Sequence, residues 1–152
     1  MKLFLLTIFF IFLSITSNAE ILKPTPLIDS NDVVSIQLKA LQQNNIPYEN
    51  AGIEQTWEFA HPANRQYTGP LENFILMMYS PSYSIMLEHQ SHKIIQIEEN
   101  DTVAFYFIEL IDKSGSQYGF EWTLKKILTE GDYNNCWMTV SVSRPIEISK
   151  GT

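Results

Sequence analysis

The sequence predicts an α+β domain in which three helices precede a four-stranded antiparallel sheet and pack on one of its faces. Two observations lead to this prediction. Between residues 33 and 87, apolar side chains recur at the spacing of amphipathic helices. From His89 onward they recur at strand spacing, in runs separated by polar turn sequences. No internal repeat or linker divides the chain, so one domain with its helices and strands segregated accounts for both halves.

The first predicted helix follows N-cap candidates at residues 30–32 and cannot continue through Pro47. Asn50 can cap a second helix, which should stop before Pro62 because the residue ahead of a proline is pushed out of the helical region. The segment that follows is expected to be a loop, until Pro70 starts a third helix. The apolar stripes of the first and third helices are Val33, Val34, Leu38 and Leu41, and Leu71, Phe74, Ile75 and Met78.

Four strands are predicted over residues 94–98, 102–111, 118–124 and 136–142. The second is almost continuously apolar, which is typical of a strand covered on both faces. In the fourth, the side expected to face the core carries Cys136, Met138, Val140 and Val142. Residues 20–31 are then an extended lead-in, residues 32–144 the domain, and residues 145–152 a loose tail.

The first 19 residues have the succession typical of a secretory signal. A positive start at Lys2 precedes an apolar run, and Ser17-Asn18-Ala19 offers the small residues that signal peptidase accepts, so we expect cleavage after Ala19. The apolar run is shorter than the ~20 residues of a spanning helix, although an uncleaved anchor is the alternative. The mature chain is therefore expected to be exported, either periplasmic or secreted, without a membrane span.

The net charge limits the classes of partner that this chain can bind, and the cysteine count limits its disulfide bonds. The chain has 152 residues and a formal net charge of -7, whereas nucleic acids and anionic membrane surfaces are bound by clustered Lys and Arg. Neither is therefore expected as a partner. Cys136 is the only cysteine, so no disulfide is predicted within the chain, and a lone thiol in an oxidising compartment is expected to be buried.

Three segments carry a resemblance to a known family: FAHPANRQYTGPLENF at 59–74, PSYSIMLEH at 81–89 and CWMTVSV at 136–142. Together they resemble the domain-of-unknown-function 4864 family, small exported proteins without an established biochemical role. The order of elements also resembles the nuclear transport factor 2-like (cystatin-like α+β) superfamily, in which helices close one side of a curved, cone-like sheet. That superfamily includes isomerases, dehydratases and non-catalytic binding domains, so the resemblance implies a concave face but leaves two classes of function open.

The first class is non-catalytic binding of a small apolar ligand or a protein partner at the concave face. Arg65 can present its planar guanidinium to an anionic group, although pairing with Glu58 or Glu72 to join two helices is the favoured interpretation. Aromatic residues such as Trp57 and Tyr106 can line a cavity or fill an ordinary core. The candidate ligand contacts are His61, Asn64, Arg65, Glu109 and Trp122.

The alternative is a cofactor-free isomerase, dehydratase or hydrolase in which Glu109 and His61 act as acid–base groups. Glu109 shares a strand face with Phe105 and Phe107, an apolar setting that suits this chemistry, but a solvated position near the turn at Lys113 is the favoured interpretation. The two classes are distinguished by whether Glu109, His61 and Arg65 point into one cavity.

Neither a cofactor nor a metal is predicted. The sequence lacks G-x-S-x-G, H-E-x-x-H, P-loop and dinucleotide-binding fingerprints. His89 and His92 would fall on opposite faces of a strand and could not hold one ion together, and no third ligand follows at zinc spacing. A hydrogen bond within the loop is the expected role for one of these two histidines.

Overall fold

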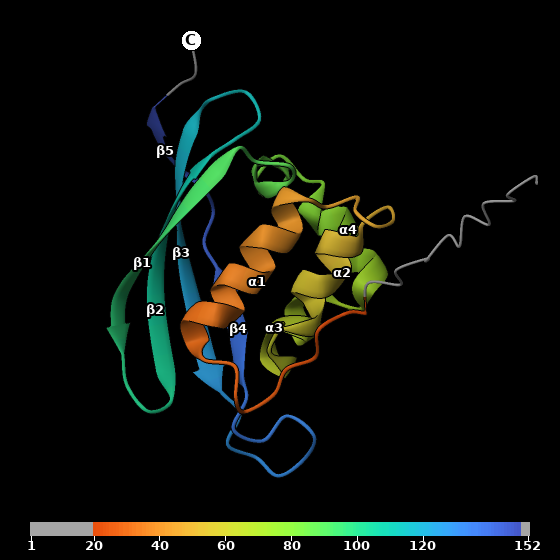
Figure 1. Cartoon of the computed structure of the whole chain (residues 1–152), viewed down its shortest axis with the longest axis vertical. Coiled ribbons are helices and arrows are strands. Elements are labelled where there is room, and N and C mark those ends of the chain that lie inside the picture. Colours follow the sequence, from red (N-terminus) through yellow and green to blue (C-terminus); the bar gives the residue numbers. More distant parts are fainter. Residues whose placement is uncertain (1–19, 150–152) are drawn as a thin grey trace, which may run out of the picture.

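The computed structural model describes residues 20–149 as a layer of helices packed on one face of an antiparallel sheet (Figure 1). The predicted α+β class is confirmed. Within residues 20–149, no helix has the length and apolar character needed to cross a membrane. The predicted signal sequence and its cleavage after Ala19 lie outside the described residues, as does the end of the predicted tail at 150–152.

Four strands form the predicted antiparallel meander, in the order β1 (Ser91–Glu99), β2 (Val103–Ile111), β3 (Gln117–Lys126) and β4 (Trp137–Val142). Side chains shape the two tight turns that join the first three strands. Asn100 Oδ1 accepts from a main-chain N–H at 2.9 Å, and Asp112 Oδ1 does the same at 2.8 Å.

The predicted loose tail contains a fifth strand, β5 (Ile146–Ser149), so this part of the prediction was wrong. β4 pairs with residues 122–126 of β3 and leaves the edge of β3 at residues 117–119 open. β5 pairs there, because an open strand edge presents unpaired N–H and C=O groups that another strand can satisfy.

α1 (Ser30–Gln42) packs on β1 and β4 on one side and on α2 (Ala51–Glu58) on the other, so it lies between the sheet and the outer helices (Figure 1). The carboxylate of Asp29 caps α1 by accepting from the Asp32 N–H at 2.8 Å. The helix therefore begins two residues before the predicted domain boundary at residue 32.

Buried Asn44 caps α2 from the end of α1. Its Oδ1 accepts from the Ile53 N–H at 3.0 Å. The predicted cap, Asn50, occupies the N-cap position with a φ of 64° but makes no side-chain cap bond. The cap of α2 thus comes from Asn44, which the reversal of the chain between α1 and α2 places beside the start of α2.

A helix occupies the segment that was predicted to be a loop. α3 (Pro62–Thr68) precedes α4 (Leu71–Met78), and a 3-10 turn, η1 (Ser84–Met86), follows. α2 ends at Glu58, before Pro62 as predicted, and Pro62 opens α3, because the first helical position requires no N–H bond. His61 is the N-cap of α3, and Gly69 ends this helix at a φ of 77°.

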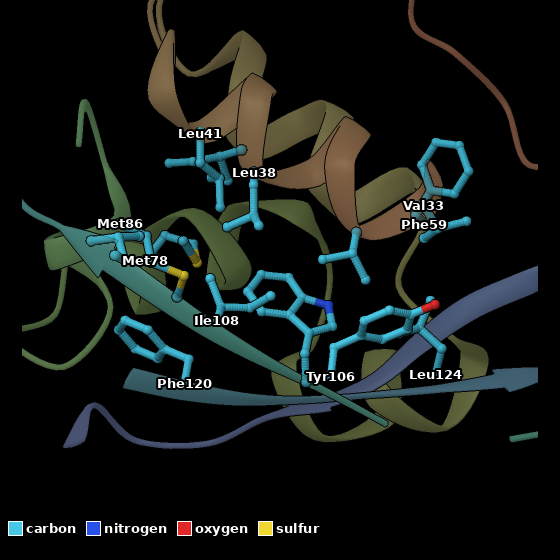
Figure 2. Packing of buried hydrophobic residues seen from close by; sticks show 14 of the residues in the cluster. Val33, Leu38, Leu41, Phe59, Met78, Met86, Tyr106, Ile108, Phe120 and Leu124 are labelled. Carbon is cyan, nitrogen blue, oxygen red and sulfur yellow. The ribbon is translucent and has the colours of Figure 1, made fainter. Parts of the chain in front are cut away.

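The main core lies between α1 and the inner face of the sheet, with the predicted stripe of α1 pointing at the strands (Figure 2). Among its fully buried members are Val33, Leu38, Leu41, Ile108, Phe120 and Leu124. The helical stripe and the strand alternation predicted from the sequence therefore meet in this core.

The outer face of β2 is not covered by a second layer, contrary to the prediction. Phe105 is 41% exposed, and Ile97 on β1 is 65% exposed. Phe107 is half-buried because its ring lies over Gly119 of β3, in the space that a Cβ would occupy. A run of apolar residues does not by itself show whether another layer or neighbouring side chains cover it.

Cys136 is buried as expected, but in a small cluster outside the main core, with Ile127, Met138 and Tyr133. The predicted phase of the strand was wrong: Trp137 faces the main core, and Met138 is paired with Lys125 on the other face. A register shift leaves Val140 without a partner on β3 and returns Val142 to the core side.

Candidate functional site

A cavity of about 210 Å³ lies between the helical layer and β4, and residues of α1, α2, α3 and α4 line it together with the strand. Its walls are apolar and include Leu41, Phe74, Met77, Met78, Met86 and Val142. The exposed fractions of the other lining residues show that the cavity has a buried, closed end and an open rim. Gln37, Thr56 and Thr139 are at most 5% exposed, whereas Tyr67 is 93% exposed.

The bulge in β4 brings consecutive residues to the cavity. A regular strand presents alternate side chains to one side, but all four residues from Thr139 to Val142 contribute to this lining. The register shift at Val140 breaks the alternation. The other edge of β4 is anchored at Thr139, whose N–H donates to Phe59 O at 2.8 Å and whose carbonyl accepts from the His61 N–H at 2.8 Å.

Three buried side chains form a hydrogen-bonded network at the closed end of the cavity. Gln37 Oε1 accepts from Thr139 Oγ1 at 2.7 Å and from Trp122 Nε1 at 3.2 Å. The Trp122 N–H also points at Thr139 Oγ1 at 3.1 Å. Gln37 Nε2 donates to the Thr56 carbonyl at 3.0 Å. Because the surroundings are apolar, these bonds hold the amide and the hydroxyl in one orientation.

Comparison with family models, curated proteins and solved structures finds no match to this chain. The cavity and the side chains around it are therefore the features from which a function can be inferred.

Two of the sequence-predicted contacts belong to this site. Asn64 lies at the rim, and its Nδ2 donates to the Thr139 carbonyl at 3.3 Å. Trp122 is 1% exposed and does not line the cavity, but its N–H orients both Gln37 and Thr139. Trp122 thus positions two cavity-lining side chains without contacting the cavity itself.

Arg65 bonds to main-chain carbonyls, not to the carboxylates of Glu58 or Glu72 as predicted. Its guanidinium group donates to the carbonyls of Trp57, Glu58 and Ala60, each at 3.0 Å. The Glu58 carboxylate instead pairs with Lys23 at 2.9 Å. These carbonyls lie at the C-terminus of α2, where the helix leaves acceptors without partners, so Arg65 caps α2 from α3.

The guanidinium also stacks on the indole of Trp57, with Cζ 3.8 Å from the ring centroid. The indole Nε1 of Trp57 is buried without a hydrogen-bond partner among the described residues. Arg65 is therefore engaged on several sides and is not one of the cavity-lining residues.

Glu109 and His61 do not meet in a common site. Glu109 lies on the outer face of β2, paired with Lys93 and Gly119. The His61 N–H is bonded to the carbonyl of Thr139 on β4. Thr139 pairs with Leu124 of β3, and Leu124 pairs with Ala104 of β2, so His61 lies beside the part of the sheet that contains Ala104. Five residues of strand separate positions 104 and 109, which is about 17 Å at ~3.4 Å per residue. Neither residue lines the cavity.

His89 and His92 are in contact, although the sequence predicted opposite faces. His89 precedes β1, so strand alternation does not apply to it. Its Nε2 lies 2.7 Å from His92 Nδ1, and its Nδ1 lies 2.7 Å from the Met86 carbonyl. Because the carbonyl only accepts, His89 Nδ1 carries the proton and donates, which is the loop bond expected for one of these histidines.

Burial lowers the pKa of His89 to about 4, against a weaker opposing effect of the bond to Met86. Burial also lowers the pKa of His92, and the nearby Lys39 adds to this. Both rings are therefore neutral at pH 7. Within residues 20–149, no group of three or more His, Cys, Asp and Glu is placed to hold a metal ion.

Sequence reasoning missed the polar residues at the closed end, Gln37 and Thr139. Gln37 carried a usable signal, because it lies three residues after Val34 and four before Leu41, within the apolar stripe of α1. A polar side chain at such a position must find buried partners. Thr139 gave no comparable signal, since Thr is an ordinary strand residue.

Proposed function

We propose that this protein binds a small apolar ligand, without catalysis, in the cavity between the helices and β4. The observation that carries the proposal is the composition of the cavity: apolar walls, an open rim, and a few buried polar groups gathered at the closed end. Its volume of about 210 Å³ exceeds that of a cavity of ~150 Å³ that accepts benzene. A ligand of one substituted ring or one short chain fits this space.

The lining supports binding over catalysis. It includes no carboxylate, imidazole, amine or thiol, which are the commonest groups in general acid–base chemistry. Its titratable groups are two phenols: Tyr67 is 93% exposed at the rim, and the Tyr83 hydroxyl donates to the Val142 carbonyl at 3.2 Å. Glu109 and His61, on which the enzymatic alternative depended, are far from each other, and neither lines the cavity.

The helical layer over an antiparallel meander, with a cavity beneath it, supports the nuclear transport factor 2-like placement and the resemblance to the domain-of-unknown-function 4864 family. Superposition of an experimental structure on members of both groups would test this part of the proposal.

The proposal also includes export of the mature chain, which rests on the first 19 residues. N-terminal sequencing of the protein from its native host is expected to begin at Glu20. An intact Met1 on cytoplasmic protein would contradict export.

Filling the cavity is expected to abolish ligand binding. Titration of the protein with toluene, followed by calorimetry or ligand-observed NMR, should give saturable one-to-one binding. Val142→Phe places a ring in the cavity and should weaken toluene at least about tenfold, because a filled cavity has no space for the ligand. Val103→Phe is the matched control, since Val103 is a half-buried strand valine that does not line the cavity.

The control variant should bind toluene as the parent does. Absence of saturable binding to the parent, or equal binding by parent and Val142→Phe, would refute the cavity as the site.

A further inference from the structure

The closed end of the cavity has hydrogen-bonding capacity that the protein itself does not use. The Gln37 carboxamide nitrogen carries two hydrogens, and one of them is used in the bond to the Thr56 carbonyl. Within the described residues, no hydrogen bond takes the second. Gln37 is 1% exposed, so this hydrogen cannot be satisfied by bulk water.

Thr139 offers the complementary capacity. Its hydroxyl donates to Gln37 Oε1 at 2.7 Å, and one lone pair faces the Trp122 N–H at 3.1 Å. A hydroxyl oxygen has two lone pairs, so Thr139 Oγ1 can accept one more hydrogen bond. Thr139 and Gln37 both line the cavity, and the bond between them fixes their separation. A spare donor and a spare acceptor therefore lie side by side at the closed end.

The cavity has nothing to balance an ionised ligand. None of its lining residues is charged, and the nearest arginine along the chain, Arg65, is bonded to the carbonyls that end α2. Burying a carboxylate or an ammonium group without a partner is costly. The site thus discriminates against charged ligands.

The walls favour an aromatic body. Three of the five methionines of the chain, Met77, Met78 and Met86, line the cavity beside Phe74. Thioethers adapt to irregular shapes and contact aromatic rings favourably, and Phe74 offers an edge or a face to a second ring.

We propose that the ligand class of this cavity is a small neutral phenol or aromatic alcohol, with its hydroxyl between Gln37 and Thr139. This inference rests on the proposed function and specifies its ligand. A hydroxyl accepts from the Gln37 Nε2–H and donates to Thr139 Oγ1 at the same time. A carbonyl could use only the donor, and a methyl group neither, so the two spare capacities select for a hydroxyl.

The test compares p-cresol with p-xylene, which replaces the hydroxyl by a methyl group of similar size. Both should bind the parent protein. Thr139→Val removes the acceptor while keeping the volume, and should weaken p-cresol at least about tenfold while leaving p-xylene within about twofold. Thr139→Ser keeps a hydroxyl and should retain p-cresol. Thr123→Val is the matched control, because Thr123 is a half-buried strand threonine that does not line the cavity; it should change neither ligand.

The possible outcomes separate the two proposals. If Thr139→Val weakens both ligands equally, or neither, the hydroxyl assignment is wrong while binding in the cavity stands. If neither ligand binds the parent, the proposed function itself fails. The preference for a neutral ligand is tested with p-toluate, which is an anion at pH 7. It should not compete with p-cresol for the cavity. Binding of p-toluate as tight as that of p-cresol would overturn the choice of a neutral ligand.

Discussion

Replacing Arg65 with alanine is expected to lower the free energy of unfolding by about 2–4 kcal/mol. The side chain donates three hydrogen bonds of 3.0 Å to carbonyls at the end of α2 and stacks on Trp57. The change removes these charge-assisted bonds and leaves half-buried acceptors without their donor. Urea denaturation of the ligand-free protein, followed by tryptophan fluorescence, measures the effect.

Two further variants make this prediction specific. Arg65→Lys should recover only part of the loss, because an ammonium group lacks the planar fork that reaches three carbonyls at once. Arg144, the other arginine of the chain, is exposed, and Arg144→Ala should change stability by no more than about 0.5 kcal/mol. If Arg65→Ala were as stable as the parent, Arg65 would have no structural role, and its availability for an anionic ligand would have to be reconsidered.

Acidification is expected to destabilise the fold through the His89–His92 pair, by up to about 3 kcal/mol between pH 7 and pH 4. The pKa of His89 in the folded protein is about 4, below its ordinary value of 6.5. Between these two values the unfolded chain takes up a proton that the folded chain does not. The stability is therefore complete above about pH 6.5 and is lost progressively as the pH falls to about 4.

The measurement is the difference in unfolding free energy between the parent and His89→Gln at several pH values. Carboxylates titrate in both proteins, so their contributions cancel in this difference. The parent should lose stability relative to the variant as the pH falls, whatever the offset between them at pH 7. A difference that stays constant from pH 7 to pH 4 would show that protonation of His89 does not oppose folding.

Much of the fold was predictable because its signals are local. The stripe at Val33, Leu38 and Leu41 specifies a helix face, and the alternation at Phe120, Trp122 and Leu124 specifies a strand face. Each pattern states which side of an element is apolar, and the structure buries those sides together. The α+β class and the order of the meander follow from such patterns.

Elements with weaker local signals were missed. α3 begins at Pro62, which was interpreted only as the end of the preceding helix, although a proline is equally suited to a helix start. β5 has only four residues, all of them exposed, with Ile146 at 49% and Ile148 at 47%; it forms because β4 does not cover the edge of β3 at residues 117–119. In both cases the deciding factor is a neighbour in space.

The sequence by itself determined the class of the domain, the faces that its elements bury and the segment that holds Asn64 and Arg65. Only the tertiary structure decided what those side chains bind. Gln37, Thr56 and Thr139 come from α1, α2 and β4, and no spacing in the chain relates them. Apolar periodicity records burial residue by residue, whereas a hydrogen bond or a cavity depends on the distance between elements. That distance is set only when the helices pack on the sheet.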